Sequence, residues 1–149
     1  MLMGIDIGGT KCGALMGEAV VLVNDDLKDN FRSYIKQNGG MLAKGWLLGL
    51  QFATLFEDGL YFSITKKAVQ DAMRIRDAFR EHGIPFHMES PTNQQFVVLD
   101  EGQMKALGKK HIFEYIASVG EGRHCVRFCT SWSTHPEDVE ELIRDIAVL

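Results

Sequence analysis

A long helical pattern near the middle of the chain constrains the fold more than any other sequence feature. Apolar residues recur at helical spacing from Ile64 to Phe79, and the basic side chains of this stretch lie largely off that face. Gly83, followed closely by Pro85, predicts the end of the helix. Helical patterns precede this point and strand-like patterns follow it, which is typical of an α+β domain.

Two further helical patterns precede this helix. The residues NDD at 24–26 can cap a helix whose apolar positions continue over 27–35, until the glycine pair at 39–40 interrupts it. A second pattern covers 41 to about 56 and is apolar nearly all round. Such a helix is expected to be buried or to lie at a subunit interface.

Strand-like segments follow the long helix at 84–89, 94–99, 112–119 and 123–132, with turn residues SPTN at 90–93. The residues THPE begin a last helix: Thr134 is predicted to cap it, Pro136 to sit in its first turn and Glu137 to complete a capping box. The N-terminal region differs, because ALMGEAVVLV at 14–23 predicts a buried strand after a glycine turn.

Composition narrows the class of protein. A chain of 149 residues is long enough for a sizeable core, and its net charge of −4 favours neither a nucleic acid nor a membrane surface as partner. No apolar run reaches the roughly 18 residues of a spanning helix, and no basic region precedes a signal-like core. The three cysteines have no disulfide-framework spacing, so we expect a cytoplasmic protein in a reducing compartment.

The stretch DIGGTKCG, residues 6–13, permits two interpretations. It is either a phosphate-binding loop, as in sugar kinases of the glucokinase type, or a glycine turn that presents Lys11 to a cofactor aldehyde. The kinase interpretation requires a second phosphate-binding strand, an adenosine-binding motif and a catalytic aspartate. None of these appears downstream, and the chain is too short for both lobes of such a fold.

Arg127 is the second candidate functional residue. In the strand HCVRFCTSW, period two places Cys125, Arg127 and Cys129 on one face. No acidic residue is adjacent in sequence, and burying an unpaired guanidinium is costly, so a substrate carboxylate is an attractive partner. The alternative is an ion pair with a structural Glu or Asp. The spacing of the two cysteines is poor for zinc, so we predict no metal site and interpret them as packing residues.

Several blocks of sequence together resemble one known family. These are GGTKCGALMGEAVVL, NDDLKDNFRSYIKQNGGMLAKG, LLGLQFATLF, ESPTNQQF and VRFCTSWSTHPEDVEELI. In order, they resemble the C-terminal part of low-specificity threonine aldolases, which are pyridoxal-phosphate (PLP) enzymes of the β-eliminating lyase group. The resemblance implies that Lys11 forms the Schiff base with pyridoxal phosphate, with Gly9 and Thr10 beside the cofactor. It also implies that Arg127 binds the α-carboxylate of the amino-acid substrate.

The resemblance implies a fold and an activity as well. The fold is the C-terminal part of a PLP-dependent transferase-like (aspartate aminotransferase-type) fold, with helices packed on a small, mainly antiparallel sheet. Residues 1–25 would end the large cofactor domain and 26–149 would form the small domain. The activity is retro-aldol cleavage of β-hydroxy-α-amino acids to glycine and an aldehyde.

The same resemblance indicates an incomplete site. The family's pyridinium aspartate, ring-stacking histidine and phosphate-cradling loop all precede its cofactor lysine, and here Lys11 lies close to the first residue. We therefore expect a truncated or split enzyme that is inactive alone, and whose partner is a separate N-terminal half or further copies in a homo-oligomer. The alternative is a non-catalytic small-domain remnant or interaction module.

Overall fold

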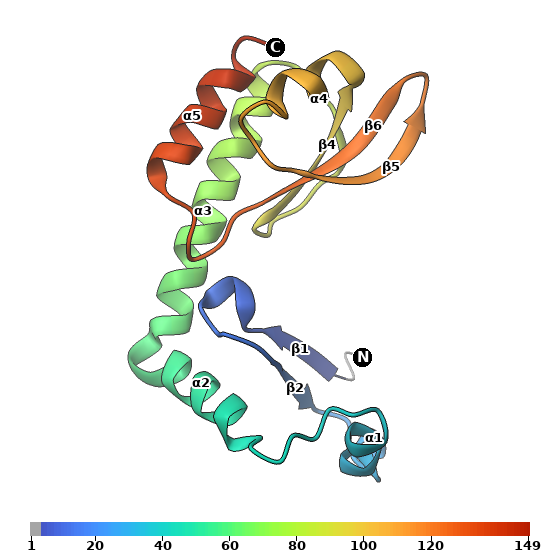
Figure 1. The fold of residues 1–149 in the computed structure, drawn as a ribbon, viewed down its shortest axis with the longest axis vertical. Coiled ribbons are helices and arrows are strands. Elements are labelled where there is room, and N and C mark those ends of the chain that lie inside the picture. Colours follow the sequence, from blue (N-terminus) through green and yellow to red (C-terminus); the bar gives the residue numbers. More distant parts are fainter. Residues whose placement is uncertain (1–3) are drawn as a thin grey trace. The chain divides into compact units, whose positions relative to one another are not determined.

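The computed structural model describes residues 4–149, which divide into two compact units, residues 4–63 and Ile64–Leu149 (Figure 1). Each unit is described here by itself. Residues 1–3 of the predicted 1–25 segment lie outside the described residues. The predicted boundary between residues 25 and 26 concerns the domains of a whole PLP enzyme, and it stays a prediction.

The first unit begins with a two-stranded antiparallel hairpin. Strand β1 (Gly4–Gly8) pairs with β2 (Glu18–Leu22), and a short 3₁₀ helix, η1 (Thr10–Cys12), lies between them. The predicted buried strand over 14–23 is wrong in extent and in burial, since Leu15 is 82% exposed and Val20 51% exposed. Residues before Glu18 form a turn, and within β2 only Ala19 and Leu22 are partly buried.

The helix predicted from residue 24 onward is two separate pieces. The Asn24 side chain caps the 3₁₀ helix η2 (Asp25–Leu27) by accepting a hydrogen bond from the Asp26 amide at 3.0 Å. Helix α1 (Phe31–Gln37) follows separately. Asn30 separates the two because its backbone adopts a left-handed conformation with φ of 57°, which a continuing helix cannot contain.

Helix α2 (Trp46–Phe56) begins later than the sequence pattern predicted, since the residues from 41 onward form a turn before it. Leu55 is its only buried residue, whereas Trp46 is 64% exposed and Leu50 54% exposed. The prediction that this helix is buried is therefore wrong for the single chain. The other prediction, that its apolar residues lie at a subunit interface, stays a prediction.

Helix α3 (Leu60–Glu81) confirms the clearest sequence prediction. A short 3₁₀ helix, η3 (Glu57–Gly59), precedes it. The predicted apolar face is buried at Ala68, Ala72, Ile75 and Phe79. The helix ends before Gly83, whose φ of 71° is a conformation that side-chain-bearing residues rarely adopt.

The second unit contains a four-stranded antiparallel sheet in the order β3-β4-β6-β5 (Figure 1). Its strands are β3 (Phe86–Met88), β4 (Gln94–Asp100), β5 (Glu114–Gly120) and β6 (Arg123–Cys129). The strand-like segments of the sequence are thereby confirmed, although β3 and β6 are shorter than predicted, and β4 and β5 each end one residue later than predicted. Side chains from α3, the sheet and the last helix form one core, with Phe79, Val97, Leu99, Val126 and Ile146 fully buried.

Two helices flank the last strands. Helix α4 (Glu101–Leu107), absent from the sequence prediction, begins with a capping box between Asp100 and Gln103. Helix α5 (Pro136–Ile146) has Pro136 in its first turn as predicted. The predicted Thr134 cap and the capping box with Glu137 are wrong. His135 holds the N-cap position without a side-chain bond, because the Thr134 hydroxyl instead accepts a hydrogen bond from the Ser131 amide at 2.9 Å.

No helix among residues 4–149 is both long enough and apolar enough to span a membrane.

Candidate functional site

Lys11 lies on an exposed turn between the two strands of the hairpin. The Gly9 carbonyl accepts hydrogen bonds from the amides of Cys12 at 2.9 Å and Ala14 at 3.0 Å. Gly13 ends the turn with a φ of 96°. Within residues 4–149, the structure shows no hydrogen bond or ion pair for the Lys11 amine. The turn is thus closed through its own backbone, and its lysine is available to a ligand.

Gly9 is buried beneath this turn. A Cβ atom at this position would lie 2.8 Å from Ala14 Cβ and 2.9 Å from Phe52 Cζ, closer than real Cβ contacts. Glycine therefore lets Phe52 of α2 pack directly against the backbone of the turn. Thr10, by contrast, is exposed beside Lys11.

A second set of polar atoms lies under the start of the turn. The Gly8 carbonyl accepts a hydrogen bond from the Tyr61 hydroxyl at 3.3 Å, and the buried Cys12 thiol lies 3.8 Å from the same oxygen. Burial raises the pKa of Tyr61, and its hydrogen bond with Cys12 acts in the same direction. The Tyr61 ring stacks on Phe56 at a centroid distance of 4.9 Å. Tyr61 is thus held in place as a support for this end of the turn.

Gln51 of α2 supports the other end. Its side-chain amide bonds the backbone of Leu15 and Met16, which immediately follow the turn. Neither Gln51 nor Tyr61 emerges from sequence reasoning. The available signal was a single glutamine within a largely apolar helix, and this signal does not indicate which backbone groups the glutamine bonds.

Arg127 lies on the inner strand β6, where both neighbouring strands contact its side chain. It forms an ion pair with Glu114, the residue directly opposite on β5. Its Nη1 donates a hydrogen bond to Gln94 Oε1 of β4 at 2.8 Å. The Nε atom is buried, and among the described residues it has no hydrogen-bond partner. The structural ion pair that the sequence left as an alternative is therefore present, while carboxylate binding by Arg127 stays a prediction.

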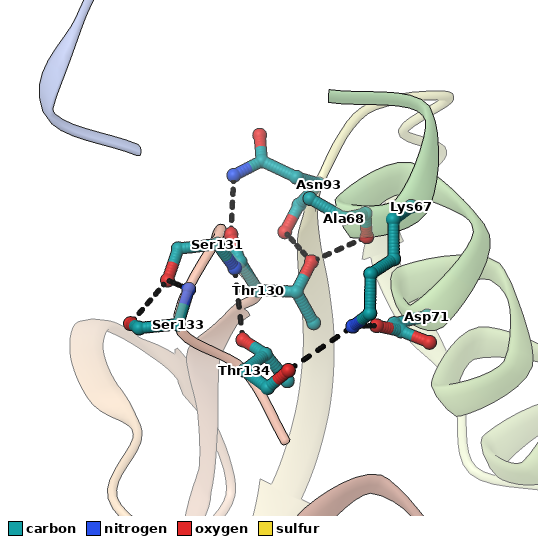
Figure 2. Close-up of polar contacts among 8 residues, drawn as sticks. All are labelled: Lys67, Ala68, Asp71, Asn93, Thr130, Ser131, Ser133 and Thr134. Atoms are coloured by element: carbon teal, nitrogen blue, oxygen red, sulfur yellow. Dashed lines mark hydrogen bonds and ion pairs between the residues drawn. The ribbon is translucent and has the colours of Figure 1, made fainter. Parts of the chain in front are cut away.

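Polar contacts tie Thr130, which follows β6, to α3 and to Asn93, which precedes β4 (Figure 2). The Thr130 hydroxyl donates to the Ala68 carbonyl of α3 at 2.6 Å, and the Thr130 amide donates to the Asn93 carbonyl at 3.0 Å. The Asn93 side chain returns a hydrogen bond to the Thr130 carbonyl at 2.7 Å. These contacts fix the backbone just beyond β6 and the backbone next to Gln94, whose side chain accepts a hydrogen bond from Arg127.

The loop after β6 is anchored to the same helix. Lys67 Nζ of α3 lies 2.7 Å from Asp71 Oδ2 and donates a hydrogen bond to the Thr134 carbonyl at 3.1 Å (Figure 2). Asp71 is buried, so this ion pair also satisfies its carboxylate. The contacts are structural, because the Lys67 amine and the Asp71 carboxylate both have partners within the second unit.

The two cysteines beside Arg127 have different environments. Cys125 is fully buried, and burial raises the pKa of its thiol, which fits the predicted packing role. Cys129 is exposed at the end of β6, so its predicted packing role is wrong. A cavity of about 420 Å³ in this unit is lined in part by Cys129 and Thr130, and Arg127 is not among its lining residues.

The predicted site residues thus fall into two groups. Gly9, Thr10 and Lys11 form one turn in the first unit, supported by α2 and Tyr61. Arg127 belongs to the second unit, together with Glu114 and Gln94.

Comparisons with known proteins agree on one group of relatives. The chain is 29% identical to the low specificity L-threonine aldolase of Pseudomonas aeruginosa in an alignment of 150 positions that covers 98% of this chain and 42% of that protein. It is 30% identical to the enzyme of the same name from a Pseudomonas species, over 96% of this chain and 42% of that protein. The chain therefore spans less than half the length of these relatives. No protein-family model matches it.

Two solved structures extend the comparison. A threonine aldolase from Leishmania major superposes with a TM-score of 0.87 and 32% sequence identity, covering 98% of this chain and 43% of that one. An 8-amino-7-oxononanoate synthase from Francisella tularensis gives a TM-score of 0.61 at 11% identity, covering 89% of this chain and 41% of that one. At this low identity, the second likeness shows the fold alone.

Helices packed on a small antiparallel sheet, together with these neighbours, define the chain as the C-terminal part of a PLP-dependent transferase-like fold. The predicted fold class is confirmed. Within this class, the chain is similar to low-specificity threonine aldolases, and the resemblance to their C-terminal portion is confirmed as well.

Proposed function

We propose that this chain carries the cofactor lysine and the carboxylate-binding arginine of a PLP-dependent carbon–carbon lyase. The reaction is retro-aldol cleavage of a β-hydroxy-α-amino acid to glycine and an aldehyde, a step of amino-acid metabolism. The observation that supports it most is the likeness to threonine aldolases over 98% of the chain, at 32% identity and a TM-score of 0.87. Lys11 and Arg127 are the residues through which the chain would act.

The residues around Lys11 fit the cofactor's chemistry. A primary amine on an exposed turn with no competing partner among residues 4–149 can reach an aldehyde carbon, and the exposed Thr10 hydroxyl beside it can contact a polar group of the ligand. When bound, PLP supplies the electron sink, and the protein supplies positioning and electrostatics. A hydrated lysine is a weak nucleophile until burial or a nearby cation lowers its pKa. Groups beyond this exposed turn must therefore complete the lysine's surroundings.

Arg127 fits the proposed carboxylate role because its guanidinium carries more donors than the structure uses. Gln94 and Glu114 each accept one of its five N–H groups. A substrate carboxylate would share the guanidinium with Glu114 or displace it. Two parallel charge-assisted hydrogen bonds would then fix the substrate's orientation as well as its position.

The proposed partners rest on the length of the chain compared with its relatives and on its exposed apolar surface. The curated relatives are more than twice as long as the matched segment, since the chain spans 42% of each. The proposed partner is a separate N-terminal half or further copies in a homo-oligomer, and the proposed location is the cytoplasm. A non-catalytic interaction module is the second candidate, favoured by the exposed apolar residues of α2 such as Trp46 and Leu50.

Covalent trapping of the cofactor tests the proposal. The chain is combined with an N-terminal half supplied in trans, incubated with PLP and reduced with borohydride, and the modified lysine is located by mass spectrometry. We expect the reduced cofactor on Lys11 in preference to other exposed lysines, such as Lys66 and Lys109. The variant Lys11→Ala should lose that label and keep the background on the others. Labelling that is uniform across the exposed lysines would contradict the proposal and favour the interaction module.

A further inference from the structure

One face of α2 lies against the turn that carries Lys11. Leu48, Gln51, Phe52 and Leu55 are spaced by three or four residues, which places them on the same side of a helix. Phe52 lies where a side chain on Gly9 would be, and Leu48 lies 3.0 Å from the Cβ position of Gly17. The helix therefore contacts the chain both before and after Lys11.

Gln51 makes the polar contacts of this face. Its Oε1 accepts hydrogen bonds from the Leu15 amide at 2.6 Å and the Met16 amide at 3.4 Å. Its Nε2 donates to the Met16 carbonyl at 3.3 Å, and also to the Leu47 carbonyl of its own helix at 3.3 Å. One side chain thus pairs with the backbone of Met16 as a neighbouring strand would.

Within residues 4–149, the backbone groups of Leu15 and Met16 have no strand partner. The ladder of the hairpin ends where Gly8 faces Glu18, so Leu15 and Met16 lie in the connection outside it. Backbone amides left without a partner favour local opening of the chain. Gln51 supplies the missing partner. It holds Leu15 and Met16, which directly follow the turn that the Ala14–Gly9 hydrogen bond closes.

We propose that Gln51 is the positioning residue of Lys11: it clamps residues 15–16 to α2 and thereby holds the lysine turn in a single conformation. The inference rests on the proposed role of Lys11 as the cofactor lysine. It extends that role by proposing that α2 sets the position of the Lys11 amine. This helix is distant from the turn in sequence, since the contact from Gln51 to Leu15 spans 36 positions.

The test compares two variants with a matched control. Gln51→Met keeps similar length and removes every hydrogen bond of the side chain. Gln51→Glu retains acceptors for the Leu15 and Met16 amides and loses the donors. Gln37→Met is the control, because Gln37 is exposed at the end of α1. Far-UV circular dichroism establishes that each chain is folded before the comparison.

The first readout is amide hydrogen exchange by NMR at Cys12 and Ala14. Both amides bond the Gly9 carbonyl and not Gln51, so a change there reports on the turn and not on the deleted contact. We expect exchange about tenfold faster in Gln51→Met, the effect of losing about one net hydrogen bond. The change should be smaller in Gln51→Glu and absent in Gln37→Met. Unchanged exchange at Cys12 and Ala14 in both Gln51 variants would overturn the proposal.

The second readout is the ratio of borohydride-trapped PLP on Lys11 to that on exposed Lys66, measured on each variant combined with an N-terminal half supplied in trans. A merely structural role would lower stability without changing this ratio in folded protein, whereas a positioning role should lower it several-fold in Gln51→Met. An equal ratio in Gln51→Met and wild type would count against positioning. If wild-type protein shows no preference for Lys11, the proposed function fails, and the amide exchange still decides whether Gln51 clamps the turn.

Discussion

Glu114 of β5 and Arg127 of β6 face each other directly across two antiparallel strands, and their side chains form an ion pair. Arg127 is about one-third exposed and Glu114 more than half exposed, so solvent and ligands can reach the pair. An arginine that already has an anionic partner can still bind a second carboxylate, because its planar group presents donors in more than one direction. The proposed substrate role of Arg127 can therefore be tested by substituting either residue of the pair.

The change Arg127→Lys should weaken substrate binding in the full-length or reconstituted enzyme. An ammonium cannot reproduce a two-point contact with a carboxylate, and losing one charge-assisted hydrogen bond costs about 1.5–3 kcal/mol, or roughly ten- to a hundredfold in affinity. Steady-state kinetics with threonine and with its carboxamide analogue would measure the effect. Arg123→Lys is the matched control. Equal losses on both substrates would show that Arg127 is structural.

The change Glu114→Gln should act in the opposite direction. Removing the resident negative charge leaves Arg127 free for the substrate carboxylate, so the apparent KM for threonine should fall while kcat stays similar. The control is Glu121→Gln, which makes the same change at a glutamate paired with a different arginine. The Glu121 side chain is 89% exposed, and its Oε2 lies 3.6 Å from Arg123 Nη2. A higher KM in Glu114→Gln would mean that the glutamate orients the guanidinium and does not compete for it.

Gly9→Ala should destabilise the first unit. The new methyl group would lie 2.8–2.9 Å from Ala14 and Phe52, and overpacking of this kind costs about 1–3 kcal/mol of unfolding free energy. Gly49→Ala in α2 is the control, because its Cβ would meet nothing within 4 Å and alanine favours a helix over glycine by about 1 kcal/mol. Urea denaturation should therefore show shifts of opposite sign. A neutral Gly9→Ala would contradict the close packing of Phe52 on the turn.

Asp145 of α5 should make stability depend on acid pH. Its hydrogen bond with His111 at 2.8 Å, and then its contacts with Lys110 at 3.0 Å, lower its pKa in the folded state. A carboxyl with a lower pKa when folded adds stability above its unfolded pKa of about 3.9, and this stability is lost as pH falls through the folded value. Thermal unfolding followed from pH 6 to pH 2 should show a shallower decline in Asp145→Asn. Parallel curves would show that the aspartate adds no pH-dependent stability.

The isolated chain should bind PLP weakly and cleave threonine poorly. The turn leaves Lys11 exposed, and the chain spans less than half of its curated relatives. Supplying an N-terminal half in trans should restore aldehyde release, measured with a coupled alcohol dehydrogenase assay. Efficient cleavage by the 149 residues alone would show that the site needs fewer groups than proposed.

Local patterns in the sequence were enough for much of the fold. The face of α3 and its end at Gly83 follow from apolar spacing and from the backbone freedom of glycine, both of which act within a few residues. The exposed Lys11 turn follows from its flanking glycines in the same way. Helix α4 was also readable, because Asp100 and Gln103 have the spacing of a capping box, although it is short and directly follows a strand.

Other features depended on which segments meet in space. The sequence by itself determined that Arg127 lies on a strand and that Lys11 lies on a glycine turn. Only the tertiary structure decided that Glu114 faces Arg127 and that Gln51 holds the segment after Lys11. The reason is physical: strand register and helix packing are set by contacts between residues far apart in the chain. No local periodicity specifies which distant side chain satisfies a given charge or backbone amide.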